Sequence, residues 1–273
     1  MLFNAQKIEN FSLRAHDGEI GKVTDLYFDD RQWRIRYLVV KTGGWLSSRQ
    51  VLISPASVDD PDFENESIPV RLTRDQIESS PSIDEDKPIT REYEESLHRH
   101  YDWPVYWMGP GYFAGAHGGV AVGALPFAPE AGGTTVVPQT GGVAAEHTAA
   151  AAAAANEPLR HADHHLQSVK TVRGWDIDAE DGGMGHVEDL IIGSQDWGVH
   201  QIVVDTRNWW PGRKVLVFPG WIKDVDWVDR HVSINLDKDT IKSGPEFDPD
   251  AIVSEKHEQA LLRHYNDVYL ARR

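Results

Sequence analysis

The chain has 273 residues, no cysteine and a formal net charge of −16. The lack of cysteine excludes disulfide bonds and cysteine-ligated zinc or redox sites. Both ends of the chain are equally acidic, since residues 1–102 hold 13 basic and 20 acidic residues and residues 157–273 hold 14 and 21. Neither part has the basic surface that generic binding to nucleic acid or to an anionic membrane requires, so we expect neither as a partner.

No stretch of the sequence has the roughly 20 apolar residues that a membrane-spanning helix needs. The N-terminus also lacks an apolar run of signal-peptide length. We therefore expect a cytoplasmic protein without a transmembrane segment, which reaches a membrane only through a partner.

In chain order, the first hundred residues predict four strands, a helical turn and a helix. Asp17-Gly18 forms the turn before the first strand, the second strand begins at Trp33 in an alternating apolar pattern, and Pro55 stops the third. Thr73 opens the helical turn with a capping box. The elements cover residues 20–28, 33–41, 51–53, 68–72, 73–79 and 90–101.

A stretch rich in Gly, Ala, Pro and Thr follows, from about Gly109 to Asn156, and ends in an alanine run. Such a composition buries too little apolar surface to offset the entropy of ordering it. We expect a flexible linker over residues 109–168, which would let the flanking parts pack on each other as an internal dimer.

The remaining residues repeat the beginning of the chain. Ala15 to Tyr101 aligns with Ala179 to Tyr265 at a constant offset of 164 without a gap, and roughly a third of the positions are identical. The second copy is expected to form strands and a helix at residues 187–192, 198–205, 215–218, 232–236 and 254–265. The residues that both copies keep include Gly21 and Gly185, Asp25 and Asp189, Trp33 and Trp197, Trp45 and Trp209, and the Arg-His-Tyr of residues 99–101 and 263–265.

These elements predict a mainly β protein with two domains in tandem. Short Val- and Ile-rich strands separated by Gly favour a small closed barrel over an open sheet. The expected domains are a barrel with its C-terminal helix at residues 1–108, the linker, and a second barrel with its helix at residues 169–273.

The sequence DGEIGKVTDL from Asp17, followed by WRIRYLVV from Trp33 and VLISP from Val51, resembles the PRC-barrel module. That module occurs in the cytoplasmic part of the photosynthetic reaction-centre H subunit and in the C-terminal part of a ribosome-maturation factor. The resemblance covers both copies. It implies a small β-barrel that holds partners in place, and it brings no catalytic residue or cofactor to any position here.

The chain also departs from these two relatives of the module. It lacks the N-terminal membrane helix of the H subunit, and it lacks the separate N-terminal domain and basic surface expected for a role on rRNA. Membership of a reaction centre and binding to rRNA are therefore disfavoured.

Tryptophans at the tip of one predicted hairpin are the candidate contact residues. Trp45 and Leu46 in the first copy, and Trp209, Trp210 and Pro211 in the second, occupy the same tip. A solvent-facing tip rarely holds indoles, because a covered aromatic side chain contributes about 2–3 kcal/mol. Either the tip folds over its own barrel, or it docks on the other copy, a second chain or a ligand.

Other polar groupings have simpler explanations. Gly21 and Gly185 with Asp25 and Asp189 are expected to serve turns and strand entry, since a phosphate loop leads into a helix rather than a strand. The cluster His161, Asp163, His164 and His165 lies beside a segment expected to be mobile, where histidines bind metal only incidentally. We therefore predict no metal site and no cofactor.

The sequence thus predicts a non-catalytic adaptor or scaffold whose barrels associate with each other or with a protein partner. One alternative is a photosynthetic electron-transport accessory that tunes proton uptake through its carboxylates and 13 histidines. Another is a metal- or small-ligand-binding module that uses the cluster from His161 to His165.

Overall fold

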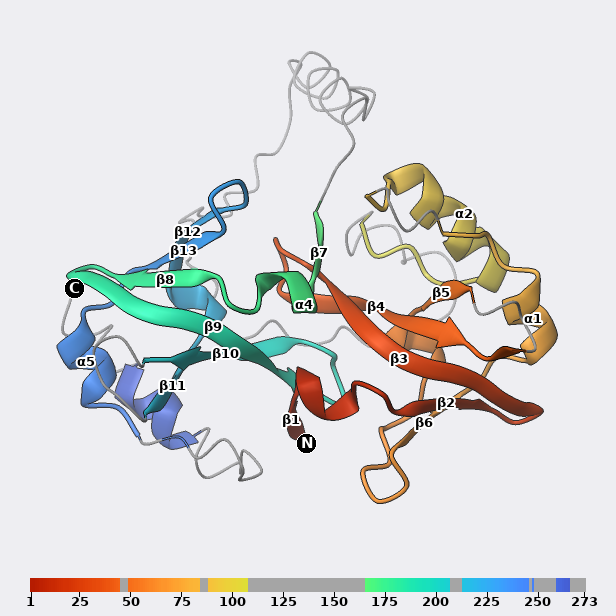
Figure 1. Ribbon diagram of the computed structural model, residues 1–273, viewed down its shortest axis with the longest axis horizontal. Helices are drawn as coiled ribbons and strands as arrows, with labels where there is room; N and C mark the ends of the chain where they lie inside the picture. Colours follow the sequence, from red (N-terminus) through yellow and green to blue (C-terminus); the bar gives the residue numbers. More distant parts are fainter. Residues whose placement is uncertain are drawn as a thin grey trace, which may run out of the picture. The chain divides into compact units, whose positions relative to one another are not determined.

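The computed structural model describes residues 1–44, 49–83, 88–107, 165–206, 213–245, 247 and 259–265. Residues Met1–Val105 and His165–Arg273 belong to one compact unit, which is built mainly of β-strands (Figure 1). Among the described residues, no helix combines the length and the apolarity needed to cross a membrane. We call residues 1–105 the first half and residues 165–273 the second half.

The first half contains a sheet with the strand order β5-β4-β3-β2-β6. Its pairs are antiparallel except for β2 and β6, which run parallel. The elements of this half are β1 (Leu2–Asn4), η1 (Ala5–Ile8), β2 (Ser12–Ala15), β3 (Gly18–Asp29), β4 (Arg34–Thr42), β5 (Gln50–Ile53), η3 (Pro55–Ser57), β6 (Ser67–Val70), α1 (Arg74–Glu78) and α2 (Arg91–Tyr101).

The second half contains a sheet with the strand order β11-β10-β9-β8-β13-β12, in which β8 and β13 run parallel. Residues 259–265 are helical as well. The elements are β7 (Leu166–Ser168), α4 (Val169–Val172), β8 (Asp176–Ala179), β9 (Gly182–Gly193), β10 (Val199–Asp205), β11 (Lys214–Val217), η5 (Pro219–Trp221), β12 (Ile222–Asp226), β13 (His231–Ile234) and α5 (Lys238–Lys242).

The mainly β architecture is confirmed, but the hydrogen-bonded ladder does not close into a continuous barrel within the described residues. β5 and β6 end the first path, and β11 and β12 end the second. In the first half, β5 runs towards Pro55, which has no N–H to donate and starts the 3-10 turn η3. The helix α2 lies beside β4 and β5 (Figure 1).

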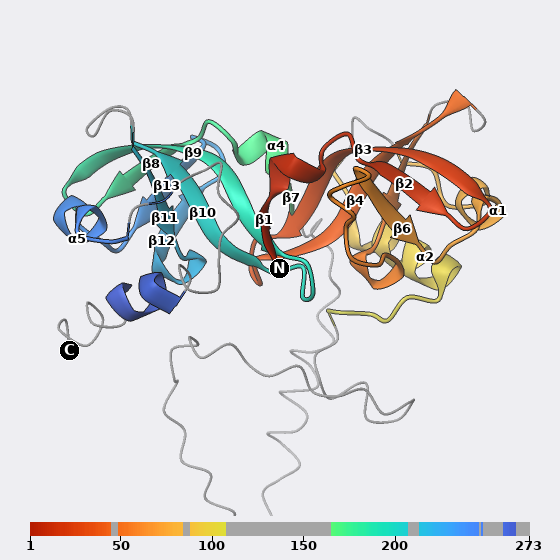
Figure 2. The ribbon, with the colours of Figure 1, turned by 90° about the horizontal axis from the view of Figure 1, so that it is seen from below.

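The first strand of each half pairs with the sheet of the other half. β1 is antiparallel to β9, with Phe3 opposite Ile192, and β7 is antiparallel to β3, with Gln167 opposite Phe28 (Figure 2). β1 and β7 are equivalent at the offset of 164, so the exchange is reciprocal. The expected linker range 109–168 therefore needs a correction at its end, because β7 belongs to the folded unit.

Two glycines allow the long strands to cross their neighbours closely. A Cβ at Gly21 would lie 2.1 Å from the backbone oxygen of Lys41, and a Cβ at Gly185 would lie 1.9 Å from that of Asp205. Only a residue without a side chain fits there, and Gly185 also has a φ of +150°. This close approach gives a physical reason for glycine at both equivalent positions.

The tight turn before β4 differs from the sequence expectation. Trp33, expected as the first strand residue, lies in the turn with a φ of 50°, and its equivalent Trp197 has a φ of 53°. The amide of Trp33 donates to the oxygen of Asp29. Each tryptophan is thereby placed at the end of a hairpin that faces the other half.

The helices begin where their capping residues predict. Thr73 and Gln76 form the reciprocal capping box of α1, and Thr90 caps α2 by accepting from the N–H of Tyr93. α2 buries Glu94, Leu97, His98 and Tyr101 on one face. Two of these four buried side chains, Glu94 and His98, are polar.

Candidate functional site: the junction of the two halves

The backbones of the two halves are hydrogen-bonded at the tryptophan turns. The N–H of Ile35 donates to the oxygen of Trp197 at 2.8 Å, and the N–H of Val199 donates to the oxygen of Trp33 at 2.7 Å. Ile35 and Val199 are themselves equivalent at the offset of 164, so the two bonds are a symmetric pair. Trp197 is buried and its ring meets that of Phe3 edge to face.

Two equivalent aspartates cap the short helices of the opposite half. Asp189 on β9 accepts from the N–H of Gln6 in η1 at 3.1 Å, and Asp25 on β3 accepts from the N–H of Lys170 in α4 at 3.2 Å. Asp25 also accepts from the hydroxyl of Ser168 at 2.6 Å. A carboxylate is favourable at a helix N-terminus because it satisfies free N–H groups.

Burial raises the pKa of both capping aspartates. Desolvation raises the pKa of Asp189 to about 6, although the bond from Gln6 and the charge of Arg173 act in the opposite direction. Desolvation likewise raises the pKa of Asp25. The junction therefore holds carboxyl groups whose charge is disfavoured by the packing of the halves.

One charged pair at the junction joins equivalent positions of the two copies. Glu9 and Arg173 are separated by 164 residues and form an ion pair in which both side chains are mostly buried. Nζ of Lys170 lies 3.7 Å from Glu9 as well. In a symmetric association of two identical copies, the residue at this position would contact the same residue of the other copy. Here the two copies carry opposite charges at this position.

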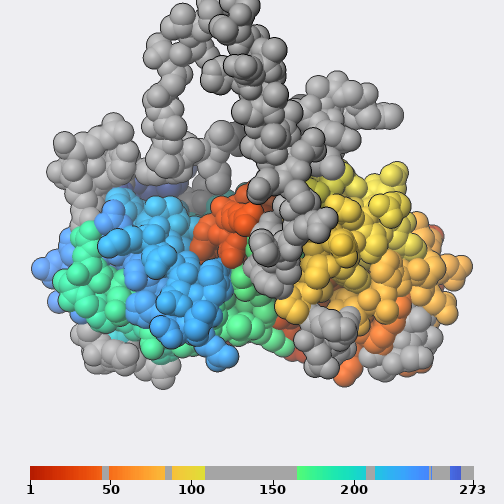
Figure 3. Space-filling view, turned by 90° about the horizontal axis from the view of Figure 1, so that it is seen from above, coloured from red at the N-terminus to blue at the C-terminus, as the bar shows by residue number. Residues whose placement is uncertain are grey.

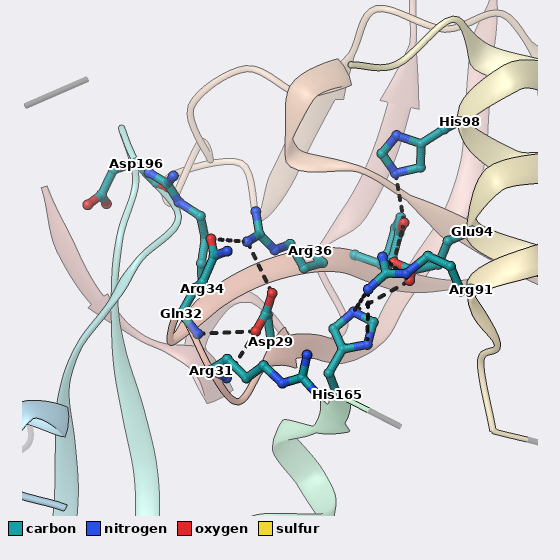
Figure 4. Close-up of polar contacts among 11 residues, drawn as sticks. Asp29, Arg31, Gln32, Arg34, Arg36, Arg91, Glu94, His98, His165 and Asp196 are labelled. Atoms are coloured by element: carbon teal, nitrogen blue, oxygen red, sulfur yellow. Dashed lines mark hydrogen bonds and ion pairs between the residues drawn. The ribbon is translucent and has the colours of Figure 1, made fainter. Parts of the chain in front are cut away.

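A buried polar cluster lies on the first half where the linker enters the fold (Figure 4). Glu94 on α2 is fully buried and forms an ion pair with Arg91, with an N–O distance of 2.8 Å. Oε2 of Glu94 also lies 3.4 Å from Nε2 of His165, and Nη2 of Arg91 lies 3.1 Å from the same nitrogen. The hydroxyl of Tyr37 on β4 donates to Oε1 of Glu94 at 2.9 Å. Three chain segments thus meet at one carboxylate: α2, β4 and the residue before β7.

His98 extends this cluster and is held in its neutral form. Burial lowers the pKa of His98 to about 4. Its Nδ1 lies 3.0 Å from the oxygen of Pro104, which can only accept, so we place the ring hydrogen on Nδ1. Nε2 then presents its lone pair to the hydroxyl of Tyr37 at 2.9 Å. Since that hydroxyl has one hydrogen, Glu94 and His98 compete for it.

A second group of polar contacts orders the β3–β4 turn beside the cluster (Figure 4). Buried Asp29 accepts from the N–H groups of Arg31 and Gln32, and its other oxygen pairs with Arg36 at 3.2 Å. Nε of Arg34 donates across the junction to the backbone oxygen of Asp196 at 2.8 Å. The turn that carries Trp33 is therefore fixed from both halves.

These contacts define what the junction can do chemically. The titratable side chains brought together are paired with each other and with backbone groups, an arrangement that holds segments in place. Within the described ranges, no three His, Asp or Glu side chains are grouped to hold a metal ion. The protonation states of Asp189 and His98 are coupled to the packing.

The hairpin-tip residues predicted from the sequence, Trp45, Leu46, Trp209, Trp210 and Pro211, lie outside the described residues. So do His161, Asp163 and His164. His165, expected to belong to a mobile segment, is instead buried against Glu94 and Arg91. The correction follows from β7, which fixes the chain directly after His165.

Sequence reasoning missed the residues that join the halves. Trp33 and Trp197 are kept in both copies, but Trp33 was expected in a strand, and Glu9 and Arg173 gave no local signal. Extending the offset of 164 towards the N-terminus would have aligned Leu2–Asn4 with Leu166–Ser168. That alignment marks both short strands as parts of the repeat.

Comparison with known families agrees with the architecture of the first half. Residues 2–77 match the PRC-barrel domain. The PRC-barrel match extends from β1 into α1. The second half is related to the first by the offset of 164 and by the same order of five strands, to which it adds β12. A search of curated proteins finds no match to the chain.

Asp189 gives the junction a testable dependence on pH. Its folded-state pKa of about 6 is above the ordinary value of 3.8, so its contribution to stability is fully present below pH 3.8 and is lost as the pH rises through 6. Relative to the wild type, Asp189→Asn should therefore gain about 2–3 kcal/mol in free energy of unfolding between pH 4 and pH 7.5. Urea denaturation at both pH values measures this difference.

The exposed carboxyl of Asp229 supplies the control for this measurement. Asp229→Asn should change stability equally at both pH values. If Asp189→Asn also showed a constant difference, the cap would not be linked to the packing of the halves.

Proposed function

We propose that the protein is a non-catalytic scaffold in which two PRC-barrel-type halves form one unit that holds a protein partner. The reciprocal exchange of β1 and β7 is the observation that carries this proposal. The exchange fixes the two copies against each other and thereby gives equivalent surface loops a defined spacing. A scaffold needs such a fixed arrangement, because binding at two points is strong only when both can be reached together.

The chemistry of the junction supports a holding role over a catalytic one. Glu94, Tyr37 and His98 are contacts of the buried interior rather than of a cleft. The opposite charges of Glu9 and Arg173 favour association of the first half with the second over association of either half with itself. The duplication has therefore produced two specialised copies.

The partner-binding surface that we propose includes the hairpin tips, with Trp45 and Leu46 in one copy and Trp209, Trp210 and Pro211 in the other. Replacing the three tryptophans with serine should reduce capture of partners by at least about tenfold, because buried aromatic side chains dominate most interfaces. The measurement is an affinity capture with the intact chain at fixed bait concentration, quantified by mass spectrometry.

Circular dichroism and thermal unfolding of the same variants give the control. The triple variant should keep the wild-type spectrum and a melting temperature within a few degrees. Unfolding of the variant would place the tips in the core, and unchanged capture would remove them from the partner surface.

A further inference from the structure

A row of polar side chains crosses the outer face of the first-half sheet. Each member lies directly opposite the next across the sheet, so their side chains share one face. The other face packs into the core, where Leu13, Val23 and Val40 are buried. In order across the sheet, the members of this first row are Gln50, Lys41, Lys22, Ser12, Ser67 and Asp62.

The second-half sheet carries a row at the same positions. Each of its members is shifted by 164 residues from a member of the first row, and each again lies directly opposite the next. The row ends on the β12–β13 hairpin, which Figure 3 shows in blue at the surface of the second half. The members of this second row are Lys214, Asp205, His186, Asp176, His231 and Asp226.

The two rows differ in charge. Arg14 and Glu19 lie opposite each other beside the first row, and Asp178 lies beside the second. With these neighbours included and histidine counted as neutral, the first row carries a net charge of +1 and the second row carries −3. The contrast is greatest at the centre of the rows. The equivalent pairs there are Lys22 and His186, Lys41 and Asp205, Ser12 and Asp176, and Arg14 and Asp178.

The two lysines of the first row face each other without a counter-charge. Lys22 and Lys41 lie directly opposite on β3 and β4, and both are exposed. Like charges at directly opposite positions of neighbouring strands are destabilising. Neither lysine forms an ion pair with the part of the chain that the structure describes. A negatively charged surface placed over the two lysines would offset this unfavourable contact.

We propose that the first row binds the second row of another copy of this chain. Asp176 is exposed, and the side chain of Asp178 is 42% exposed although it lies 3.4 Å from His231. The two aspartates are two residues apart on β8, about 7 Å along the strand, which two lysine side chains can span. Lys22 and Lys41 of one copy would thus meet these carboxylates of the next.

The contact joins unlike surfaces, because the basic row of one copy meets the acidic row of another. Each copy carries one row of each kind, so it can bind a neighbour on either side. The association goes beyond the proposed scaffold function and does not depend on the identity of its protein partner.

Sedimentation velocity of the full chain over a range of concentrations tests this association. The sedimentation coefficient of the wild type should rise with concentration. One double variant, Lys22→Glu with Lys41→Glu, reverses the charge of the first row. A second double variant, Asp176→Lys with Asp178→Lys, reverses the charge beside and within the second row. Each variant alone should stay monomeric at concentrations at which the wild type associates.

The two double variants separate contact between the rows from an effect of net charge. The first variant adds four negative charges to the net charge of −16, and the second adds four positive charges. If net charge controlled association, the second variant would associate more strongly than the wild type, because self-repulsion would fall. The proposal instead predicts that both variants lose association. Mixing them in equal amounts should restore it, because each reversed row then meets its reversed counterpart.

Exposed charges elsewhere on the chain supply the controls. Glu95→Lys and Arg99→Glu on α2 should leave the association unchanged. Circular dichroism should give the wild-type spectrum for every variant, because the substituted side chains lie at the surface. If a reversal variant does not fold, the neutral pairs Lys22→Gln with Lys41→Gln and Asp176→Asn with Asp178→Asn replace it. Each neutral pair should weaken the association by about three- to tenfold.

Three outcomes would overturn the proposal. A wild type that stays monomeric at every concentration would contradict it, and so would reversal variants that associate as the wild type does or a mixture that does not recover. In each case the scaffold function would stand. If the wild type stays monomeric but the reversal variants lose the captured partner in the affinity experiment, the rows bind that partner instead of a second copy.

Discussion

Replacing Glu94 with alanine should lower the free energy of unfolding by about 3–5 kcal/mol, the largest effect that we expect from one side chain. Glu94 is fully buried, and its carboxylate contacts Arg91, His165 and the hydroxyl of Tyr37. The alanine variant removes the negative charge while Arg91 stays mostly buried. Most of the lost stability therefore comes from leaving Arg91 and the other partners buried without the carboxylate, and less from the loss of the ion pair itself.

Two variants on the same helix identify the cause of that loss. Glu94→Gln keeps the shape and one acceptor, so it should cost less than Glu94→Ala. Glu95→Ala changes an exposed neighbour and should stay within about 0.5 kcal/mol of the wild type. Urea denaturation measures all three, and a change below about 1 kcal/mol for Glu94→Ala would show that the cluster does not stabilise the fold.

The strands and helices were predictable because their signals are local. Thr73 and Thr90 cap the helices that begin after them. The apolar run of residues 20–28 falls in β3, and the run of residues 215–218 overlaps β11 up to Val217. Gly21 was expected to serve a turn or strand entry, but it lies inside β3, where the backbone of Lys41 on β4 approaches it closely.

The junction could not be predicted in the same way, because its partners are distant and symmetric. β1 carries the same pattern whether it pairs with β3 of its own half or with β9 of the other, so local sequence does not choose between them. His165 is polar and follows a linker, and only the position of Glu94 in space explains its burial.

The exchange of first strands makes two opposite predictions for engineered disulfides. Asn4 on β1 lies opposite Ile191 on β9. If β1 paired with β3 of its own half instead, Asn4 would lie opposite Tyr27, the residue equivalent to Ile191. Paired residues of neighbouring antiparallel strands lie about 4.5–5.5 Å apart at Cα, a distance that a disulfide can span. The natural chain has no cysteine, so any disulfide formed joins the introduced residues.

The measurement that tests the interlocked halves most directly compares two double variants. The first pair is Asn4→Cys with Ile191→Cys, and the second pair is Asn4→Cys with Tyr27→Cys. Both variants carry a protease site inserted within residues 109–156. After oxidation and cleavage, a non-reducing denaturing gel separates the two fragments unless a disulfide joins them. We expect the first pair to keep the fragments together and the second pair to release them. Fragments released from the first pair, with a disulfide formed between positions 4 and 27 in the second, would contradict the exchange.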